Sequence, residues 1–155
     1  MTNTRIQRYT GKNLYTKLVK ELEKARKLII AVTPFIDRDS VDKLTKLAAG
    51  GTRVYIVTLN DPRKTMKTLQ YIAEKASEVQ NLWCYALRSI HAKIYIVDLE
   101  KMLTGSVNLV KTANKNIENL EVIDDPDYIA IEAVKLISTV LREAKSCKEA
   151  AAEKQ

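Results

Sequence analysis

One histidine and one lysine, two positions apart, begin the stretch of this chain that could do chemistry. His91 and Lys93 are followed by Asp98 and by the run GSVN at positions 105–108. A neutral imidazole can attack phosphorus or transfer a proton. Lysine, serine and asparagine side chains can stabilise the negative charge that develops on phosphate oxygens. These residue types together indicate chemistry at a phosphodiester.

The spacing of these residues is as informative as their types. The pattern H-x-K, four residues, D, six residues, G-S-x-N resembles the HKD signature of the phospholipase D superfamily, and all of its fixed positions are present. Six fixed positions at about 5% usage each match by chance at about 10⁻⁸ per starting point. Asn116, Glu118 and Asn119 also match the N-x-E-N of the small Nuc-type endonucleases in that superfamily. The resemblance extends from about residue 14 to about residue 141.

The resemblance implies a metal-independent phosphodiesterase that uses no cofactor. The reaction would pass through a phosphohistidine, which water then hydrolyses. That scheme needs two imidazoles, one as nucleophile and one as acid, but His91 is the only histidine in the chain. We therefore expect a homodimer whose twofold axis brings two copies of His91 together.

The resemblance also implies a role for each residue of the pattern. The expected site residues are, by role, catalytic His91, Lys93 and Glu118, phosphate-binding Lys93, Ser106 and Asn108, and supporting Asp98, Gly105 and Asn116. Glu118 would accept a hydrogen bond from the histidine and fix its tautomer, as carboxylates commonly do. The simpler interpretation is that Glu118 is an exposed charge and that Ser106 and Asn108 are turn residues.

The first element that must position these groups is a predicted strand over residues 91–98, because the run 94–97 consists of β-formers. Side chains alternate across a strand, so His91 and Lys93 should share one face. Asp98 has the opposite parity to His91. We expect it at the strand end, where it orients other groups without touching substrate.

A second strand is predicted over residues 102–108, interrupted by Gly105. The same parity places Ser106 and Asn108 on one face. Lys111 and Lys115 follow in a polar loop, where they either contact a nucleic-acid backbone or are solvated lysines.

The rest of the chain alternates predicted helices and strands. Hydrophobic periodicity and capping residues predict helices at about 12–26, from Asp39 or Ser40 to Gly50, from Pro62 to about 77 and from Asp125, with strands at 28–32, 54–59, 82–87 and 120–123. Residues 1–10 are interpreted as a polar lead-in, with a short strand there left open, and those from about 145 as frayed helix or an extension of the preceding helix. The fold class expected is α/β, a mixed central β-sheet with helices on both faces (a phospholipase D-like half-unit), in one domain spanning 1–155.

Composition indicates what kind of partner the protein binds and in which compartment it is found. The formal net charge of +7 suits a phosphate-bearing partner, nucleic acid or anionic lipid, although many small proteins are basic for solubility alone. No signal peptide or membrane-spanning run is recognisable, so we expect a cytoplasmic protein. Cys84 and Cys147 are expected to be free thiols, with a disulfide left open. No His/Cys cluster indicates a metal site.

The function expected is an endonuclease of low sequence specificity, because no base-reading motif is recognisable and phosphate contacts alone suffice for such binding. DNA and RNA remain open as substrates. A phospholipid hydrolase or phosphatidyl transferase is the first alternative, but the sequence shows no interfacial helix. A nucleic-acid-binding module is the second, although retention of both His91 and Lys93 favours activity.

Overall fold

Eight strands form one continuous sheet, and most of them coincide with the apolar runs of the sequence. The computed structural model describes residues 4–153. The strands are β1 (Arg5–Gly11), β2 (Leu28–Val32), β3 (Arg53–Leu59), β4 (Leu82–Leu87), β5 (Ile94–Val97), β6 (Lys101–Gly105), β7 (Glu118–Asp124) and β8 (Lys145–Ser146). The helices are α1 (Leu14–Glu23), α2 (Arg38–Ala49), α3 (Met66–Glu78), α4 (Pro126–Glu143), α5 (Cys147–Ala152) and the 3₁₀ helix η1 (Lys111–Lys115).

The sheet is mixed, with strand order β1-β7-β6-β5-β2-β3-β4-β8. β2, β3 and β4 are parallel, and the helices α2 and α3 connect them. The other pairings are antiparallel. Parallel strands need crossover connections, which place helices over the faces of a sheet. The chain therefore has the predicted mixed sheet with helices on both faces.

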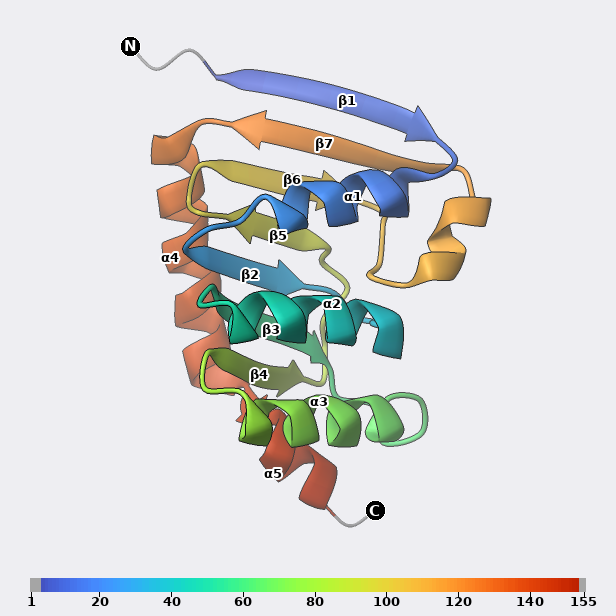
Figure 1. Ribbon diagram of the computed structural model, residues 1–155, viewed down its shortest axis with the longest axis vertical. Coiled ribbons are helices and arrows are strands. Elements are labelled where there is room, and N and C mark those ends of the chain that lie inside the picture. The colour runs from blue at the N-terminus through green and yellow to red at the C-terminus, as the bar shows by residue number, and fades with distance from the viewer. Residues whose placement is uncertain (1–3, 154–155) are drawn as a thin grey trace.

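The two faces of the sheet are covered unequally (Figure 1). α1, α2, α3 and α5 pack on the front face, where they bury side chains such as Ile29 and Ala31 of β2. α4 alone packs on the back face, over Ile30 and Val32 of the same strand. Alternating side chains of β2 thus enter two separate cores, which is why this strand is apolar throughout.

Helix starts differ from the prediction by a few residues. Asp37, not Asp39 or Ser40, caps α2, because its carboxylate accepts the backbone N–H of Ser40 at 2.8 Å. α3 begins at Met66 and not after Pro62. The intervening residues form a separate turn, in which the hydroxyl of Thr65 accepts the N–H of Asp61 at 2.9 Å.

Both ends of the chain are more ordered than the sequence indicated. The expected polar lead-in contains β1, which pairs along its whole length with β7, while residues 1–3 lie outside the described residues. The expectation of frayed helix after residue 145 is wrong for residues 145–152, because β8 pairs with the edge of β4 and α5 packs on the front core.

The expectation of two free thiols is also wrong. Cys84 of β4 and Cys147 of α5 form a disulfide, with their Cα atoms 5.3 Å apart. Sequence spacing could not show this, because the two cysteines are 63 positions apart and only the pairing of β8 with β4 brings Cys147 back to Cys84.

The apolar side of α4 is broader than the back core needs. Ile129, Ala133 and Val140 are buried, but Ile137 is 46% exposed and Leu141 is 76% exposed. Further exposed apolar residues on the same helix are Tyr128, Ile131 and Val134. No helix within residues 4–153 has the length and hydropathy needed to cross a bilayer.

Candidate active site

The predicted catalytic pair lies just outside the sheet, at the end of the strands where β5 begins. His91, Ala92 and Lys93 precede β5 in an irregular segment, so the predicted strand over 91–98 is too long at its start. Regular pairing begins only at Ile94. This residue pairs with Val32, the last residue of β2, and with Thr104 of β6.

The backbone of this segment brings His91 and Lys93 together without strand parity. The Lys93 ammonium donates to the carbonyl oxygen of His91 at 3.0 Å. The Lys93 carbonyl in turn accepts the hydroxyl of Thr104 at 3.1 Å. The His91 side chain is exposed and has no hydrogen-bond partner among residues 4–153. Its imidazole is therefore accessible to a ligand or to a second subunit.

Gly105 lets β6 approach β7 closely at the same edge. A Cβ at this position would lie 2.2 Å from the carbonyl oxygen of Asn119, and the φ of +151° is also unfavourable for other residues. The close approach allows the Ser106 N–H to donate to the Asn119 carbonyl at 3.0 Å. The predicted second strand over 102–108 therefore ends early, at Gly105.

Ser106 and Glu118 are in direct contact. The Ser106 hydroxyl donates to the Glu118 carboxylate and accepts the backbone N–H of Asn119 at 2.9 Å. The resemblance implied instead that Glu118 would accept a hydrogen bond from His91. Within the described chain the only hydrogen bond to the Glu118 side chain comes from Ser106, so the proposed orienting role remains a prediction.

Two residues that the sequence analysis did not assign to the site hold the segment that contains Asn108. The hydroxyl of Thr33, at the end of β2, lies 3.3 Å from the Asn108 side-chain oxygen and accepts the Leu109 N–H at 3.2 Å. The buried Tyr95 hydroxyl donates to the Val107 carbonyl at 2.6 Å. Burial raises the pKa of Tyr95, so the phenol stays protonated as a donor.

Asp37 is a third residue that the sequence analysis missed. Besides capping α2, its carboxylate accepts the Lys111 N–H at 2.7 Å, and its own N–H donates to the Leu109 carbonyl at 3.0 Å. The segment after β6 is thus fixed to the start of α2. Thr33 and Asp37 are hard to recognise as site residues in the sequence, because their neighbours are mostly apolar. The only available signal was that both follow the end of a predicted strand.

Asp98 lies at the opposite end of the strands from the other motif residues. Its carboxylate accepts the backbone N–H groups of Arg26 at 3.0 Å, Lys27 at 2.8 Å and Leu28 at 2.9 Å. Burial opposes ionisation of this carboxyl, but the three backbone donors outweigh it and lower the pKa of Asp98. Asp98 therefore fixes the turn between α1 and β2.

Asn116 and its neighbour Ile117 are exposed immediately before Glu118, and Ile117 is 75% exposed. The exposed cations Arg88, Lys111 and Lys115 flank the same edge in sequence, two of them within η1. The start of β5 and the loops around it therefore combine an accessible imidazole, hydroxyl and amide groups, and basic side chains.

Comparisons with known proteins place this fold and motif in one family. The family described as "Cardiolipin synthase, PLD-like domain" matches residues 18–143. The chain belongs to this phospholipase D-like family. The family and the retained motif define the class of protein, a phosphodiester-acting enzyme of the phospholipase D superfamily. No curated protein matches the sequence.

Solved structures share the fold at low sequence identity. Nuc from Salmonella typhimurium, a phospholipase D family member, superposes with a TM-score of 0.73 at 22% identity, covering 93% of this chain and 98% of that one. Phosphatidylserine synthase of Haemophilus influenzae gives 0.73 at 18% identity, over 98% of this chain and 41% of that one. The archaeal chromatin protein TrmBL2, described with a novel mode of DNA binding, gives 0.69 at 23%, over 91% and 54%.

Proposed function

We propose that this protein is a metal-independent phosphodiesterase that cleaves nucleic acid as an endonuclease of low sequence specificity. The observation that carries the proposal is the accessible His91 imidazole beside Lys93, at the edge that also holds Ser106, Asn108 and Glu118. Full retention of this set supports a catalytic domain over a module that only binds.

The proposed reaction has two displacements at phosphorus. Neutral His91 attacks phosphorus, an N–P bond forms, and the bond to the leaving oxygen breaks as His91 of the partner subunit donates its proton to that oxygen. Water then attacks phosphorus, loses a proton to the second imidazole, and releases His91. Lys93, Ser106 and Asn108 would stabilise the charge on the phosphate oxygens throughout.

The proposed dimer supplies the second imidazole. Ile117 is 75% exposed beside Glu118, and Phe35 is 39% exposed in the loop after β2, at the same edge of the sheet. Exposed apolar side chains next to the site support burial against a second copy there. Each single domain would then contribute one half of a shared site.

Positive charge around the start of β5 supports nucleic acid as the substrate. The net charge of +7 and the exposed cations Arg88, Lys111 and Lys115 suit a polyanion. A phosphatidyl transferase is the second candidate, because the matched family is described as cardiolipin synthase and a phosphatidylserine synthase shares the fold. The helix α4 runs along the end of the strands opposite to the start of β5 (Figure 1), so its exposed apolar residues do not lie beside the residues that precede β5.

The deciding experiment is a cleavage assay in excess EDTA with labelled single- and double-stranded DNA and RNA. We expect cleavage to survive EDTA and to fall by about 10³-fold or more in His91→Ala. Lys67→Ala, an exposed change on α3, is the matched control and should be fully active. The rate should rise and then fall with pH, because one imidazole must be neutral and the other protonated.

Other results would redirect the assignment. Turnover of phosphatidylglycerol or cardiolipin without nucleic-acid cleavage would establish the transferase. Tight binding of nucleic acid without turnover would establish the binding module. Light scattering tests the dimer: Ile117→Asp should give an inactive monomer, whereas Ile131→Asp, on α4, should stay dimeric, and an active monomer would refute the shared site.

A further inference from the structure

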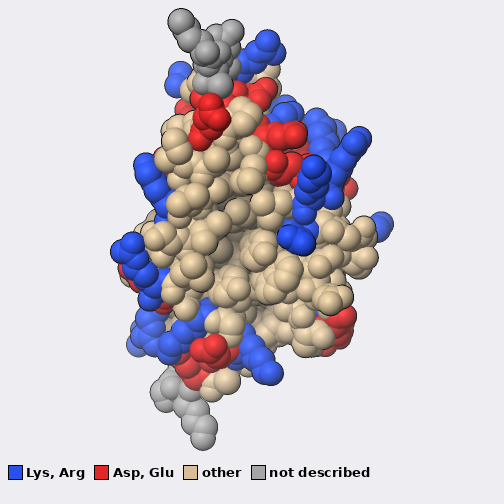
Figure 2. Space-filling view, turned by 90° about the vertical axis from the view of Figure 1, so that its left-hand side faces the viewer, with Lys and Arg blue, Asp and Glu red and all other residues tan. Residues whose placement is uncertain are grey.

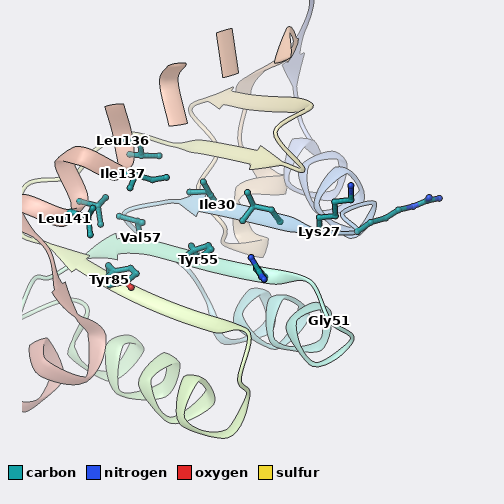
Figure 3. Close-up of a pocket in the computed structure, with 13 residues that line it drawn as sticks. Lys27, Ile30, Gly51, Tyr55, Val57, Tyr85, Leu136, Ile137 and Leu141 are labelled. Atoms are coloured by element: carbon teal, nitrogen blue, oxygen red, sulfur yellow. The ribbon is translucent and has the colours of Figure 1, made fainter. Parts of the chain in front are cut away.

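A cavity of about 700 Å³ lies on the back face of the sheet, at the end of the strands opposite to His91 (Figure 3). Its floor is the first halves of β2 and β3, and its wall is the second half of α4. A single straight helix cannot follow a twisted sheet along its whole width, which explains why space remains between them. Ligand pockets typically measure roughly 300–1,000 Å³, so the volume is that of a binding site.

The inner part of the cavity is apolar. Ile30, Val57, Tyr55 and Tyr85 point into it from the sheet, and α4 contributes Leu136, Ile137 and Leu141 (Figure 3). Ile137 and Leu141 are 46% and 76% exposed, although both face this hollow. The side of the molecule that carries α4 shows a broad uncharged surface, hollowed near its centre, with Lys and Arg side chains beside it (Figure 2). Such a contiguous apolar surface marks a binding surface on a folded protein.

The outer end of the cavity carries three cations. Arg26, Lys27 and Arg53 line it where β2 and β3 begin, and all three are exposed. None of their side chains forms an ion pair or hydrogen bond with residues 4–153. Asp98 stays ionised and interacts electrostatically with Lys27, so it offsets part of that one charge. Arg26 and Arg53 have no acidic partner among residues 4–153, so the cationic end keeps a net positive charge.

We propose that this cavity is a second ligand site, which binds an amphiphilic anion. An alkyl chain would lie between Tyr55 and the exposed side chains of α4, and a phosphate or carboxylate head would lie against Arg26, Lys27 and Arg53. Charge complementarity selects this occupant over an uncharged one. The residues of the active-site edge do not line the cavity, so the ligand is not the substrate of His91.

A second copy of the chain fits the cavity less well. The apolar surface that it would present is the exposed stripe of α4, which is flanked by Lys135 and Arg142 as well as by Glu132. Glu132 is already paired with Lys135, whose ammonium lies 3.3 Å from the carboxylate, and Arg142 adds a further cation to this surface. It would cover the hollow without neutralising the three cations.

The chain contains its own reporter for the test. Trp83 is the only tryptophan, and its ring stacks on that of Tyr55 with centroids 4.7 Å apart. Tyr55 lines the cavity, so a ligand there should change Trp83 fluorescence. The full chain is titrated with dodecyl phosphate and with dodecanoate, each below its micelle concentration. Dodecyltrimethylammonium controls for the chain alone and inorganic phosphate for the head alone.

We expect saturable binding of the two anionic amphiphiles, at least tenfold tighter than of the cationic one, and no response to inorganic phosphate. The ratio of the two affinities shows whether the head preferred is phosphate or carboxylate. Arg53→Glu and Ile137→Glu should each weaken binding at least tenfold. Arg5→Glu on β1 and Ile131→Glu on α4 are the matched controls, because both are exposed and neither lines the cavity.

Three results would overturn the proposal. Equal binding of the cationic amphiphile would show detergent adsorption without a charge-selective site. Unchanged binding in Arg53→Glu and Ile137→Glu would place the ligand elsewhere. Self-association that both Ile137→Glu and Ile131→Glu abolish, without any titration, would assign the face to a second copy. Nucleic-acid cleavage should be unchanged in Arg53→Glu, so this test is independent of the catalytic proposal.

Discussion

The two ends of the strands hold parts of one sequence motif but use them in opposite ways. At the end where β5 begins, His91 and Lys93 are accessible, and the neighbouring loops are joined by hydrogen bonds. At the other end, Asp98 accepts three backbone N–H groups and so holds the turn between α1 and β2. Asp98 therefore belongs to the motif as a residue that holds the backbone in place, whereas His91 and Lys93 are accessible to a ligand.

Polar groups are also satisfied differently at the two ends. Thr33, Asp37 and Tyr95 each bind the segment after β6, so the active-site edge is held rigidly from three elements. The cavity end instead leaves Arg26 and Arg53 without partners among the described residues. A preorganised edge suits chemistry, which needs fixed donors. An unsatisfied charge beside an apolar hollow suits reversible binding.

The largest effect on stability should come from the disulfide, which belongs neither to the His91 end of the strands nor to the cavity end. Reduction of the Cys84–Cys147 disulfide should lower the free energy of unfolding by about 4 kcal/mol, because 63 residues of the unfolded chain are released from a loop. Cleavage at 25 °C should be retained, since the bond joins β4 to α5. Urea unfolding with and without dithiothreitol measures the difference, and a Cys84→Ala/Cys147→Ala protein should not respond to the reductant.

Gly105→Ala tests how tightly the active-site edge is packed. The added Cβ meets the Asn119 carbonyl, so β6 and β7 must separate, at a cost of about 1–3 kcal/mol. Ser106 should move away from Glu118 and cleavage should fall. Gly11→Ala is the matched control, because its φ is also positive, at +144°, but a Cβ there has nothing within 4 Å. Equal losses in thermal denaturation of the two variants would attribute the effect to backbone strain alone.

Thr33→Val tests whether the missed residues position Asn108. The change keeps the shape of a buried side chain but removes a hydroxyl that donates to the Phe35 carbonyl at 2.7 Å, lies 3.3 Å from the Asn108 side-chain oxygen and accepts the Leu109 N–H, at a cost of about 1–2 kcal/mol. We expect kcat to fall about tenfold, because displaced donors bind the phosphate less well. Thr45→Val, which removes a hydrogen bond to Val41 within α2, is the control and should keep full kcat.

Asp98→Asn should have the smallest effect and should act on stability alone. The folded pKa of this carboxyl is lowered, so its contribution is present above its unfolded pKa of about 3.9 and is lost as the pH falls through the lower folded pKa. The variant should lose about 1 kcal/mol at neutral pH, and the difference should vanish in acid. Urea unfolding across pH measures it, with exposed Asp124→Asn as control; abolished cleavage in a folded Asp98→Asn protein would contradict the comparison.

The sequence by itself determined the family, the mixed sheet and the identity of the catalytic candidates. The HKD pattern is local, since it spans positions 91–108, and apolar runs such as Leu28–Val32 report burial on both faces directly. Strand ends were less predictable, because pairing stops where a neighbouring strand stops. This is why His91 and Lys93 lie outside β5 although the β-forming run that follows them favours a strand.

Only the tertiary structure decided what depends on contacts between distant segments. Thr33 and Asn108 are 75 residues apart, and Cys84 and Cys147 are 63 apart, so no local pattern could pair them. The cavity is assembled from β2, β3, β4 and α4, and each of its residues looks like ordinary core or surface in sequence. Periodicity records which side chains are apolar, whereas the number of helices available to cover a sheet decides which of them stay exposed.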